Sequence, residues 1–312
     1  MKVAVLGDGN VGRAVFRELQ NVSNINEIVL VGRNPSRLEA EVHDYLDAIV
    51  LRGFTLPHLS YGGYEATRDA DILVYCIGSA KVTNDRMEML QDNCQIACSV
   101  FEEVCKYNQD SIIICVTNPV DVITMQIAKC SGRDRRKVIG TGTLLDSARL
   151  TRFVADFLEI SSKSIQMHVV GEHGGSSVAL LSSFRVAGMT LDEYLNSETG
   201  AEGHIDPDKV NAIIRDAGFR IFRGKGYTNY GVAAAVCALV NTIASDMREL
   251  LPASVLLEGE YGVEGVAASV PVVVGKGGVE SIKRMKMTPE EDAGFFASVD
   301  VIREAAHSVG LC

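Results

Sequence analysis

The first half of the chain alternates short apolar runs with stretches of helical character, and this alternation limits the possible folds more than any other feature. The runs are rich in Val, Ile and Leu, and they are KVAVLG (2–7), EIVLVG (27–32), DILVYCIG (71–78), SIIICVTN (111–118) and KVIGTGT (137–143). Continuous apolarity of this kind is typical of parallel strands that helices cover on both faces. The pattern therefore predicts an α/β fold built on a doubly wound parallel sheet.

Two helix starts carry clear local signals. Asn34 followed by Pro35 places a capping side chain and then a proline at the first helical position. The segment TPEE at 288–291 is a capping box, which predicts a C-terminal helix that runs to about residue 308.

The character of the sequence changes after residue 143. The amphipathic helical segment LLDSARLTRFVADFLEI (144–160) is followed by mixed strand and helix patterns rather than by a regular alternation. A chain of 312 residues is long enough for two structural units. We therefore predict a parallel-sheet domain at 1–143 and a second domain of α+β type at 144–312.

A glycine pattern follows the first apolar run. Gly7, Gly9 and Gly12 form G-x-G-x-x-G between a predicted strand and a predicted helix. In this context the pattern indicates a dinucleotide site, because the glycines permit a tight turn and the helix amides, from Asn10 and Val11 onward, face the phosphates. The N-terminal domain is thus expected to be a Rossmann domain.

The second apolar run departs from the usual nicotinamide nucleotide pattern. An acidic residue that binds the adenosine ribose normally stands at its end, about 20 residues after the glycines. This chain has Gly32 there and Arg33 next, with Ser36 and Arg37 close behind. A guanidinium and a hydroxyl suit a 2′-phosphate, so we predict that NADPH is accepted and preferred through Arg33. The alternative is that Arg33 is a solvated turn residue and that NADH binds without its usual ribose anchor.

Composition excludes some classes of partner. The formal net charge of −10 argues against nucleic acid, which needs a basic face. No apolar run approaches the ~18 residues of a membrane span, so no membrane partner is expected. The eight cysteines form no CxxC pair, which favours buried thiols in a reducing cytoplasm and no bound metal.

Three further segments carry groups with catalytic chemistry. TGTLLDSAR holds Asp146 and Arg149, which are three residues apart on one helix face. VVGEHGGSS places His173 beside glycines, where its ring can face a cleft, and GSAKVTNDRMEML carries Lys81 and Arg86 after a strand end. Histidine titrates near working pH, a carboxylate can fix its tautomer, and arginine can hold a substrate carboxylate by two parallel hydrogen bonds.

Over nearly its whole length, the chain resembles the lactate/malate dehydrogenase superfamily. The resemblance rests on GDGNVG, TNPVDVIT, KVIGTGTLLDSAR, GEHGGSS and GKGYTNYGVA, which occur in the family's order and spacing. NPVDVIT, VIGTGTLLD and GKGYTNYGVA look closest to L-2-hydroxyisocaproate dehydrogenases. The resemblance implies an NAD(P)-linked oxidoreductase that acts on an L-2-hydroxy acid.

The resemblance also implies roles for individual residues. His173 matches the proton donor and acceptor, Asp146 matches its carboxylate partner, and Arg149 matches the residue that binds the substrate carboxylate. The mobile-loop arginine that polarises the reacting carbonyl matches Arg86. Further positions match the surroundings of nicotinamide and substrate, and they are Gly78, Asn118 and Thr228.

The substrate is less narrowly defined than the chemistry. Lys81 falls where lactate enzymes tend to have Gln and malate enzymes Arg. We predict a small monocarboxylic 2-keto acid, of the lactate or 2-hydroxyisocaproate type. The alternative is a malate dehydrogenase in which Lys81 and Arg86 bind oxaloacetate. A non-catalytic NAD(P)-binding sensor is disfavoured, because it would need none of the four residues His173, Asp146, Arg149 and Arg86. Members of the family are mostly dimers or tetramers, so the resemblance implies a homodimer or a homotetramer.

Overall fold

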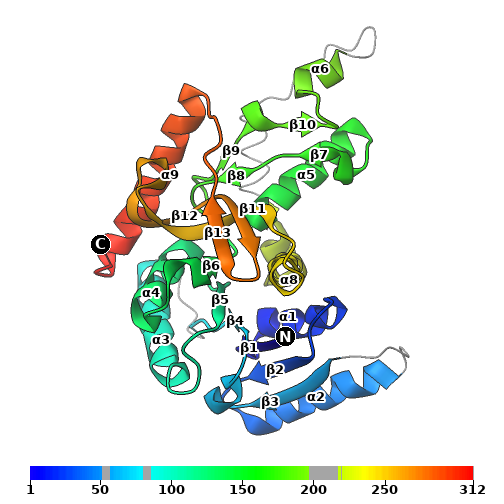
Figure 1. The fold of residues 1–312 in the computed structure, drawn as a ribbon, viewed down its shortest axis with the longest axis vertical. Helices are drawn as coiled ribbons and strands as arrows, with labels where there is room; N and C mark the ends of the chain where they lie inside the picture. Colours follow the sequence, from blue (N-terminus) through cyan, green and yellow to red (C-terminus); the bar gives the residue numbers. More distant parts are fainter. Residues whose placement is uncertain (51–56, 80–85, 197–216, 219, 312) are drawn as a thin grey trace.

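The computed structural model describes residues 1–50, 57–79, 86–196, 217–218 and 220–311. A parallel sheet forms the first half, as predicted (Figure 1). Its strands are β1 (Lys2–Leu6), β2 (Glu27–Val31), β3 (His58–Gly62), β4 (Ile72–Tyr75), β5 (Ile112–Cys115) and β6 (Val138–Gly140). The spatial order β3-β2-β1-β4-β5-β6 is that of a Rossmann domain, which confirms the predicted fold class.

The edge strand β3 was not expected from the sequence. Its residues HLSYG lack a continuous apolar run, because the strand lies at the edge of the sheet and only Leu59 among its five residues is buried. The other five strands correspond to the five apolar runs, and each is buried along most of its length.

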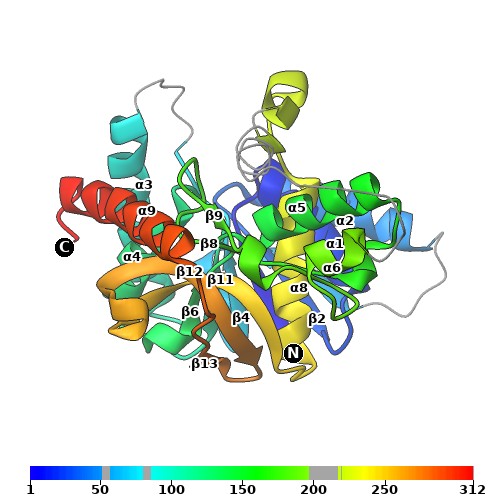
Figure 2. The same cartoon turned by 90° about the horizontal axis from the view of Figure 1, so that it is seen from above.

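Helices cover both faces of the sheet, with α1, α2 and α8 on one side and α3, α4 and α9 on the other (Figure 2). The helices are α1 (Asn10–Glu18), α2 (Pro35–Val50), α3 (Arg86–Val104), α4 (Val120–Ser131), α5 (Leu144–Leu158), α6 (Leu191–Leu195), α8 (Tyr230–Ala244) and α9 (Pro289–Ser308). Both predicted caps are present. The Asn34 side chain accepts from the Arg37 amide at 3.2 Å, and Thr288 and Glu291 form the reciprocal capping box of α9.

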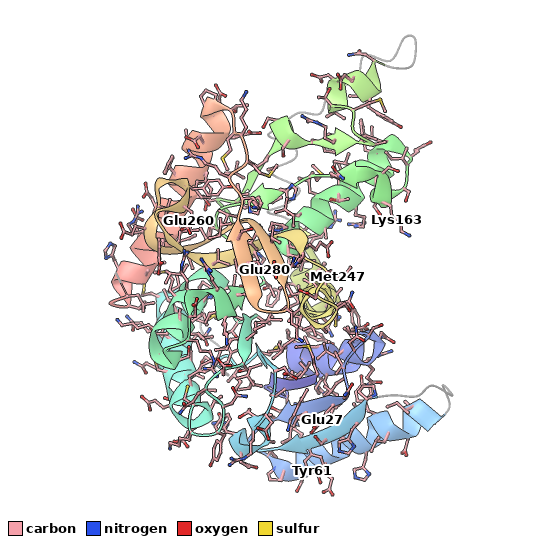
Figure 3. All side chains as sticks on the ribbon, viewed as in Figure 1. Glu27, Tyr61, Lys163, Met247, Glu260 and Glu280 are labelled. Atoms are coloured by element: carbon pink, nitrogen blue, oxygen red, sulfur yellow. The ribbon has the colours of Figure 1, made fainter. Side chains whose placement is uncertain are left out.

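Three long antiparallel strands from the second half extend the same sheet. They are β11 (Glu249–Glu258), β12 (Glu264–Gly275) and β13 (Gly278–Ile282), and β11 joins β6 where Ser254 pairs with Gly140. A Cβ at Gly140 would lie 2.9 Å from that of Ser254, so glycine permits this close approach. The result is one sheet of nine strands, whose two edges carry Tyr61 and Glu280 (Figure 3).

The rest of the second half packs around α5. Two small antiparallel pairs are formed by β7 (Ile165–Gln166) with β10 (Arg185–Val186) and by β8 (Val169–Val170) with β9 (Val178–Ala179). They enclose a second, smaller apolar core of Leu150, Val154, Ala155, Ile165, Met167, Val169, Ala179, Phe184 and Val186. The division into domains at residue 143 stays a prediction, since the sheet itself continues across that point.

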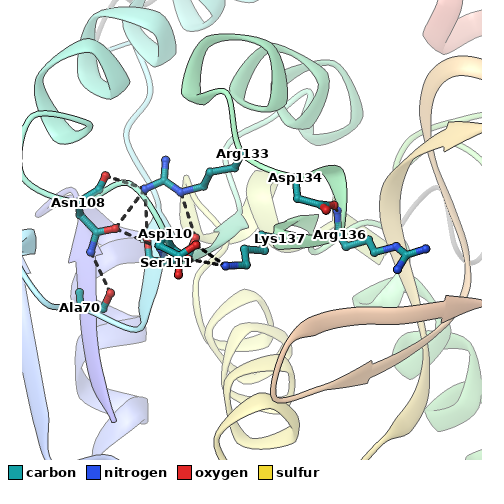
Figure 4. A network of polar contacts seen from close by, with 8 residues as sticks. All are labelled: Ala70, Asn108, Asp110, Ser111, Arg133, Asp134, Arg136 and Lys137. Carbon is teal, nitrogen blue, oxygen red and sulfur yellow. Dashed lines mark hydrogen bonds and ion pairs between the residues drawn. The ribbon is translucent and has the colours of Figure 1, made fainter.

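A buried arginine organises the amino ends of β4, β5 and β6 (Figure 4). Arg133 is 8% exposed, and its guanidinium donates to the carbonyls of Ser111 (3.0 Å) and Asn108 (2.9 Å). The Asn108 amide in turn donates to the carbonyls of Thr67 and Ala70, both at 2.9 Å. This network joins three loops at the amino ends of the parallel strands, whereas the glycine turn lies at their carboxyl ends.

No helix in the described part of the chain has the length and apolarity needed to cross a membrane.

Candidate active site

The glycine turn lies at the carboxyl end of β1, as the motif predicts. Gly7 adopts φ +113°, a conformation that favours glycine, and its amide donates to the carbonyl of Val31 at 2.8 Å. A Cβ at Gly12 would lie only 1.8 Å from the Gly7 carbonyl oxygen, so helix α1 can approach the turn only with glycine at this position.

The start of α1 is open. A Cβ at Gly9 would meet no atom within 4 Å, and the helix has neither a side-chain cap nor an acidic residue in its first turn. Asn10 Oδ1 is used elsewhere, since it accepts from Arg13 at 3.0 Å. Free amides and an unobstructed approach fit the pyrophosphate of a dinucleotide at residues 9–12.

The carboxyl end of β2 differs from the expectation based on sequence. Arg33 is exposed, and the neighbouring arginine, Arg37, forms an ion pair with Asp8 of the glycine turn, with Nε 3.2 Å from Oδ2. Arg37 also donates to the Asp8 carbonyl at 3.2 Å. The carboxylate of Asp8 lies beside Gly32: a Cβ at position 32 would be 3.6 Å from its Cγ.

The carboxyl ends of β4 and β5 are joined by Asn93 of α3. Its side chain accepts from the Ser79 amide at 2.7 Å and donates to the Asn118 carbonyl at 2.8 Å. A Cβ at Gly78 would contact Thr117 and Asn93 at 3.4 and 3.6 Å. The side chain of Asn118 is exposed at this edge, before the cis peptide bond to Pro119. Gly78 and Asn118 thus lie near one another, on either side of Asn93.

Helix α5 carries a buried carboxylate between two basic side chains. Asp146 Oδ2 is 2.6 Å from His173 Nδ1, and Asp146 Oδ1 accepts from Arg149 Nη1 at 3.0 Å. The Asp146 side chain is 6% exposed, against 16% for Arg149 and 22% for His173. The structure therefore brings together His173 and Asp146, which the sequence analysis proposed for catalysis, and Arg149, which it proposed as the residue that binds the substrate carboxylate.

The ionisation of this cluster follows from its burial and its charges. Burial alone would lower the pKa of His173, but the charge and hydrogen bond of Asp146 raise that pKa above its ordinary 6.5. Burial opposes ionisation of Asp146 too, yet His173 and Arg149 together hold the pKa of this carboxyl below its usual 3.8. The pair is thus an imidazole that holds its proton more tightly than usual and a carboxylate that stays charged.

The histidine segment is attached to the sheet at Gly171 and to helix α4 at His173. The backbone of Gly171 exchanges two hydrogen bonds of 2.9 Å with Ser269 of β12. The His173 amide donates to the carboxylate of Asp121, in α4, at 2.8 Å. Burial raises the pKa of Asp121 to about 6, although the hydrogen bond from the His173 amide opposes this.

Asp121 was not identified from the sequence as a site residue. A signal was present, because the carboxylate stands inside the TNPVDVIT segment, on a helix that otherwise reads as apolar. An Asp in an apolar helical run needs a partner when it is buried, and here the partner is the backbone of the histidine segment.

The structure describes three further proposed residues to different extents. Lys81 lies outside the described residues, and Arg86 is the first residue of α3 with a side chain outside the described part. Thr228 is half-buried just before α8, whose Gly231 packs against Leu145 at the start of α5. Among the residues that the structure describes, no three His, Cys, Asp or Glu side chains form a group that could hold a metal ion.

Comparison with known proteins gives a consistent result for both halves. Residues 1–140 match the lactate/malate dehydrogenase NAD binding domain, and residues 143–309 match the alpha/beta C-terminal domain of the same family. The chain is 33% identical to L-lactate dehydrogenase 2 of Clostridium acetobutylicum over 97% of this chain and 95% of that protein. It is 34% identical to L-lactate dehydrogenase of Acetivibrio thermocellus, over 93% and 91% of the two chains.

A solved structure supports the same assignment. The minor L-lactate dehydrogenase from Enterococcus mundtii, in a ligands-bound form, superposes with a TM-score of 0.93 at 30% identity and covers 100% of this chain and 99% of its own. The chain therefore belongs to the lactate/malate dehydrogenase family and is an NAD-dependent oxidoreductase that acts on a CH–OH group.

Proposed function

We propose that the protein interconverts a small monocarboxylic 2-keto acid and its L-2-hydroxy acid, with pyruvate and lactate as the first candidates. The observation that carries this proposal is the buried array of His173, Asp146 and Arg149. The L-lactate dehydrogenases to which the chain is similar support lactate within this class, which also includes the hydroxyisocaproate type, and malate chemistry remains the alternative.

The geometry suits proton transfer at the carbonyl oxygen. Because Nδ1 of His173 is bonded to Asp146, its Nε2 is the ring nitrogen left to exchange a proton with substrate. In the reducing direction His173 donates that proton to the oxygen on which negative charge develops, and Asp146 stabilises the charged imidazolium. NADH, when bound, supplies the hydride.

Arg149 is placed to hold the substrate carboxylate. Nη1 of its guanidinium donates to Asp146, which fixes the orientation of the side chain, and Arg149 is 16% exposed and so remains accessible. A two-point grip on the carboxylate would fix which face of the carbonyl receives the hydride. We assign Arg86 to polarisation of the carbonyl and Asn118 and Thr228 to the walls of the site.

The preferred cofactor is the second part of the proposal. The sequence analysis predicted NADPH through Arg33, but the Asp8 carboxylate beside Gly32 would repel a 2′-phosphate. We therefore favour NADH, with Gly7, Gly9, Asn10, Val11, Gly12 and Gly78 around the cofactor. Replacement of Arg33 by Ala should leave the KM for NADH and for NADPH unchanged; a selective rise in the KM for NADPH would restore the original prediction.

One assay tests the reaction itself. Purified protein is mixed with NADH or NADPH and with pyruvate, 4-methyl-2-oxopentanoate or oxaloacetate, and loss of the reduced nicotinamide is followed at about 340 nm. We expect turnover with a monocarboxylic acid, unaffected by Lys81→Gln. Turnover with oxaloacetate alone, lost in Lys81→Gln, would indicate malate chemistry. Folded protein that binds NADH but turns over none of the acids would instead be a sensor.

Two properties stay predictions. We expect a homodimer or a homotetramer, and exposed apolar side chains at Ile221, Phe222 and Tyr230 offer surface for such an interface. We also expect a cytoplasmic location. Sedimentation would test the oligomeric state, and cell fractionation would test the location.

A further inference from the structure

Position 32 lacks a side chain, but the space that a side chain there would occupy already contains a carboxylate. An ideal Cβ built on Gly32 would lie 3.6 Å from Cγ of Asp8 and 3.1 Å from Cδ2 of Leu38. In dinucleotide-binding folds the acid at the end of the second strand accepts hydrogen bonds from the adenosine ribose. Here a carboxylate reaches the same place from the glycine turn on the first strand.

The Asp8 carboxylate is held in this place by the first turn of α2. Arg37 Nε lies 3.2 Å from Asp8 Oδ2, and Arg37 Nη2 donates to the Asp8 carbonyl at 3.2 Å. The Arg37 backbone is itself fixed, because its amide donates to the capping side chain of Asn34 at 3.2 Å. The Asp8 side chain is 27% exposed, so it remains accessible to a bound molecule.

We propose that Asp8 is the residue that binds the adenosine ribose of NAD in this protein and that Arg37 positions it. The inference rests on the proposed use of NADH and names the group that recognises it. A carboxylate oxygen can accept from the adjacent 2′- and 3′-hydroxyls of a ribose. The same negative charge disfavours a 2′-phosphate, and of the two arginines near this place Arg37 is already paired with Asp8.

Equilibrium binding to the full-length protein tests this assignment without catalysis. NADH and NADPH are titrated separately, and nicotinamide fluorescence gives a Kd for each. Asp8→Asn removes the charge with little change in shape, so we expect the Kd for NADH to rise about tenfold and the Kd for NADPH to fall. An NADH Kd within twofold of the wild-type value would overturn the proposal.

A matched control comes from the same region of the fold. Glu41 in α2 is 23% exposed and pairs with Arg13 at 3.3 Å, so Glu41→Gln removes one similar carboxylate charge at a similar ion pair. We expect Glu41→Gln to leave both Kd values within twofold of wild type. An equal loss of NADH affinity in this control would mean that the loss is not specific to position 8, and the assignment of Asp8 would fall.

Relocation of the acid separates a binding role from a structural one. The double variant Asp8→Ala, Gly32→Asp returns the carboxylate to the second strand; the backbone there is not left-handed, and the nearest obstacle is the flexible end of Leu38. We expect it to recover NADH affinity to within about threefold of wild type, while Asp8→Ala alone does not. Failure of the folded double variant to recover affinity would count against the proposal.

The outcome is independent of whether the proposed reaction is correct. NADH binding that depends on Asp8 in a protein that reduces none of the three keto acids would refute the proposed reaction and retain this inference. Rapid reduction of pyruvate with an Asp8→Asn protein that binds NADH normally would do the reverse.

Discussion

Strand β6 is preceded by Arg133, which is buried, and followed by helix α5 with Arg149, which is partly buried, and the two arginines are satisfied in different ways. At the amino ends of β4–β6, Arg133 donates to neutral acceptors from Asn108 and Ser111 (Figure 4). At the opposite side of the molecule, Arg149 in α5 donates to the carboxylate of Asp146, which also binds the catalytic candidate His173. Arg133 thus connects loops of the fold, whereas Arg149 lies beside the titrating pair of His173 and Asp146.

The difference teaches how to separate structural from functional buried charge. Arg133 is enclosed by backbone carbonyls that have no other described use, so its loss would leave several acceptors unpaired. Arg149 is instead bonded to the carboxylate of Asp146, whose other oxygen lies 2.6 Å from His173. A buried charge held by fixed backbone acceptors stabilises the fold, whereas one in a cluster of titrating side chains indicates a candidate site.

The largest effect is expected at the imidazole. His173→Gln removes the proton donor, so kcat/KM for keto-acid reduction should fall about 10²- to 10⁴-fold. The Kd for NADH and the free energy of unfolding should change little, as fluorescence titration and urea denaturation would show. A variant that keeps more than a tenth of wild-type kcat/KM would remove His173 from the proposed mechanism.

Two matched arginine substitutions test the comparison directly. Arg149→Met removes the proposed grip on the substrate carboxylate, and kcat/KM should fall about 10²- to 10³-fold at nearly unchanged stability. Arg133→Met should instead lower the free energy of unfolding by about 2–4 kcal/mol, because it leaves buried carbonyls without donors. Steady-state kinetics and urea denaturation on both variants would measure this, and kcat/KM of Arg133→Met should stay within about threefold of wild type. The comparison fails if the two variants lose the same property.

The pH profile gives a further test of the site. Since the pKa of His173 is raised above 6.5, kcat/KM for reduction should be constant near pH 6.5 and should fall as pH rises through this raised pKa. Oxidation of the hydroxy acid should show the opposite trend. The protonated His173 also stabilises the fold below its unfolded pKa, and this contribution is lost over the same upper pH range.

Replacement of Asp146, the partner of His173, should shift the pH at which kcat/KM for reduction falls. In Asp146→Asn the raising charge is gone and burial remains, so the fall in kcat/KM for reduction should move to lower pH, with a lower plateau. If kcat/KM for reduction still falls at the same pH as in the wild type, Asp146 does not set the pKa of His173.

The smallest effect is expected at the exposed rim of the Arg133 network. Lys137 Nζ lies 2.5 Å from Asp110 Oδ1, but Asp110 is almost fully exposed. Water screens such a pair, so Lys137→Met should not measurably change the melting temperature or the activity. A marked loss of stability would mean that the network extends to its surface members.

Much of the fold could be predicted because its signals are local. Five buried strands appear as apolar runs, and the cap at Asn34 and the capping box at Thr288 are set by neighbouring residues. The edge strand β3 escaped prediction because half-exposed strands need no apolar run. The pairing of Ser254 with Gly140, which joins β11 to the parallel sheet, is a contact between distant segments that no local pattern encodes.

The residues of the site could likewise be predicted only where the signal is local. Asp146 and Arg149 are three residues apart, and their placement on one helix face follows from the helix itself. Family resemblance connected them to His173. The position of Asp8 beside Gly32 depends on how two strand ends and α2 pack, so the sequence alone suggested an open site for Arg33 there.

The continuity of the nine-stranded sheet has a consequence for the evolution of such enzymes. The cofactor-binding half is not a detachable module, because an isolated first half would leave the outer edge of β6 without β11 and open to association with other chains. The histidine segment is anchored to β12 through Gly171 and Ser269, so it is inherited together with the strands that complete the sheet. Recombination that gave such a protein a new substrate half would have to replace the edge of its sheet and its candidate proton donor in a single event.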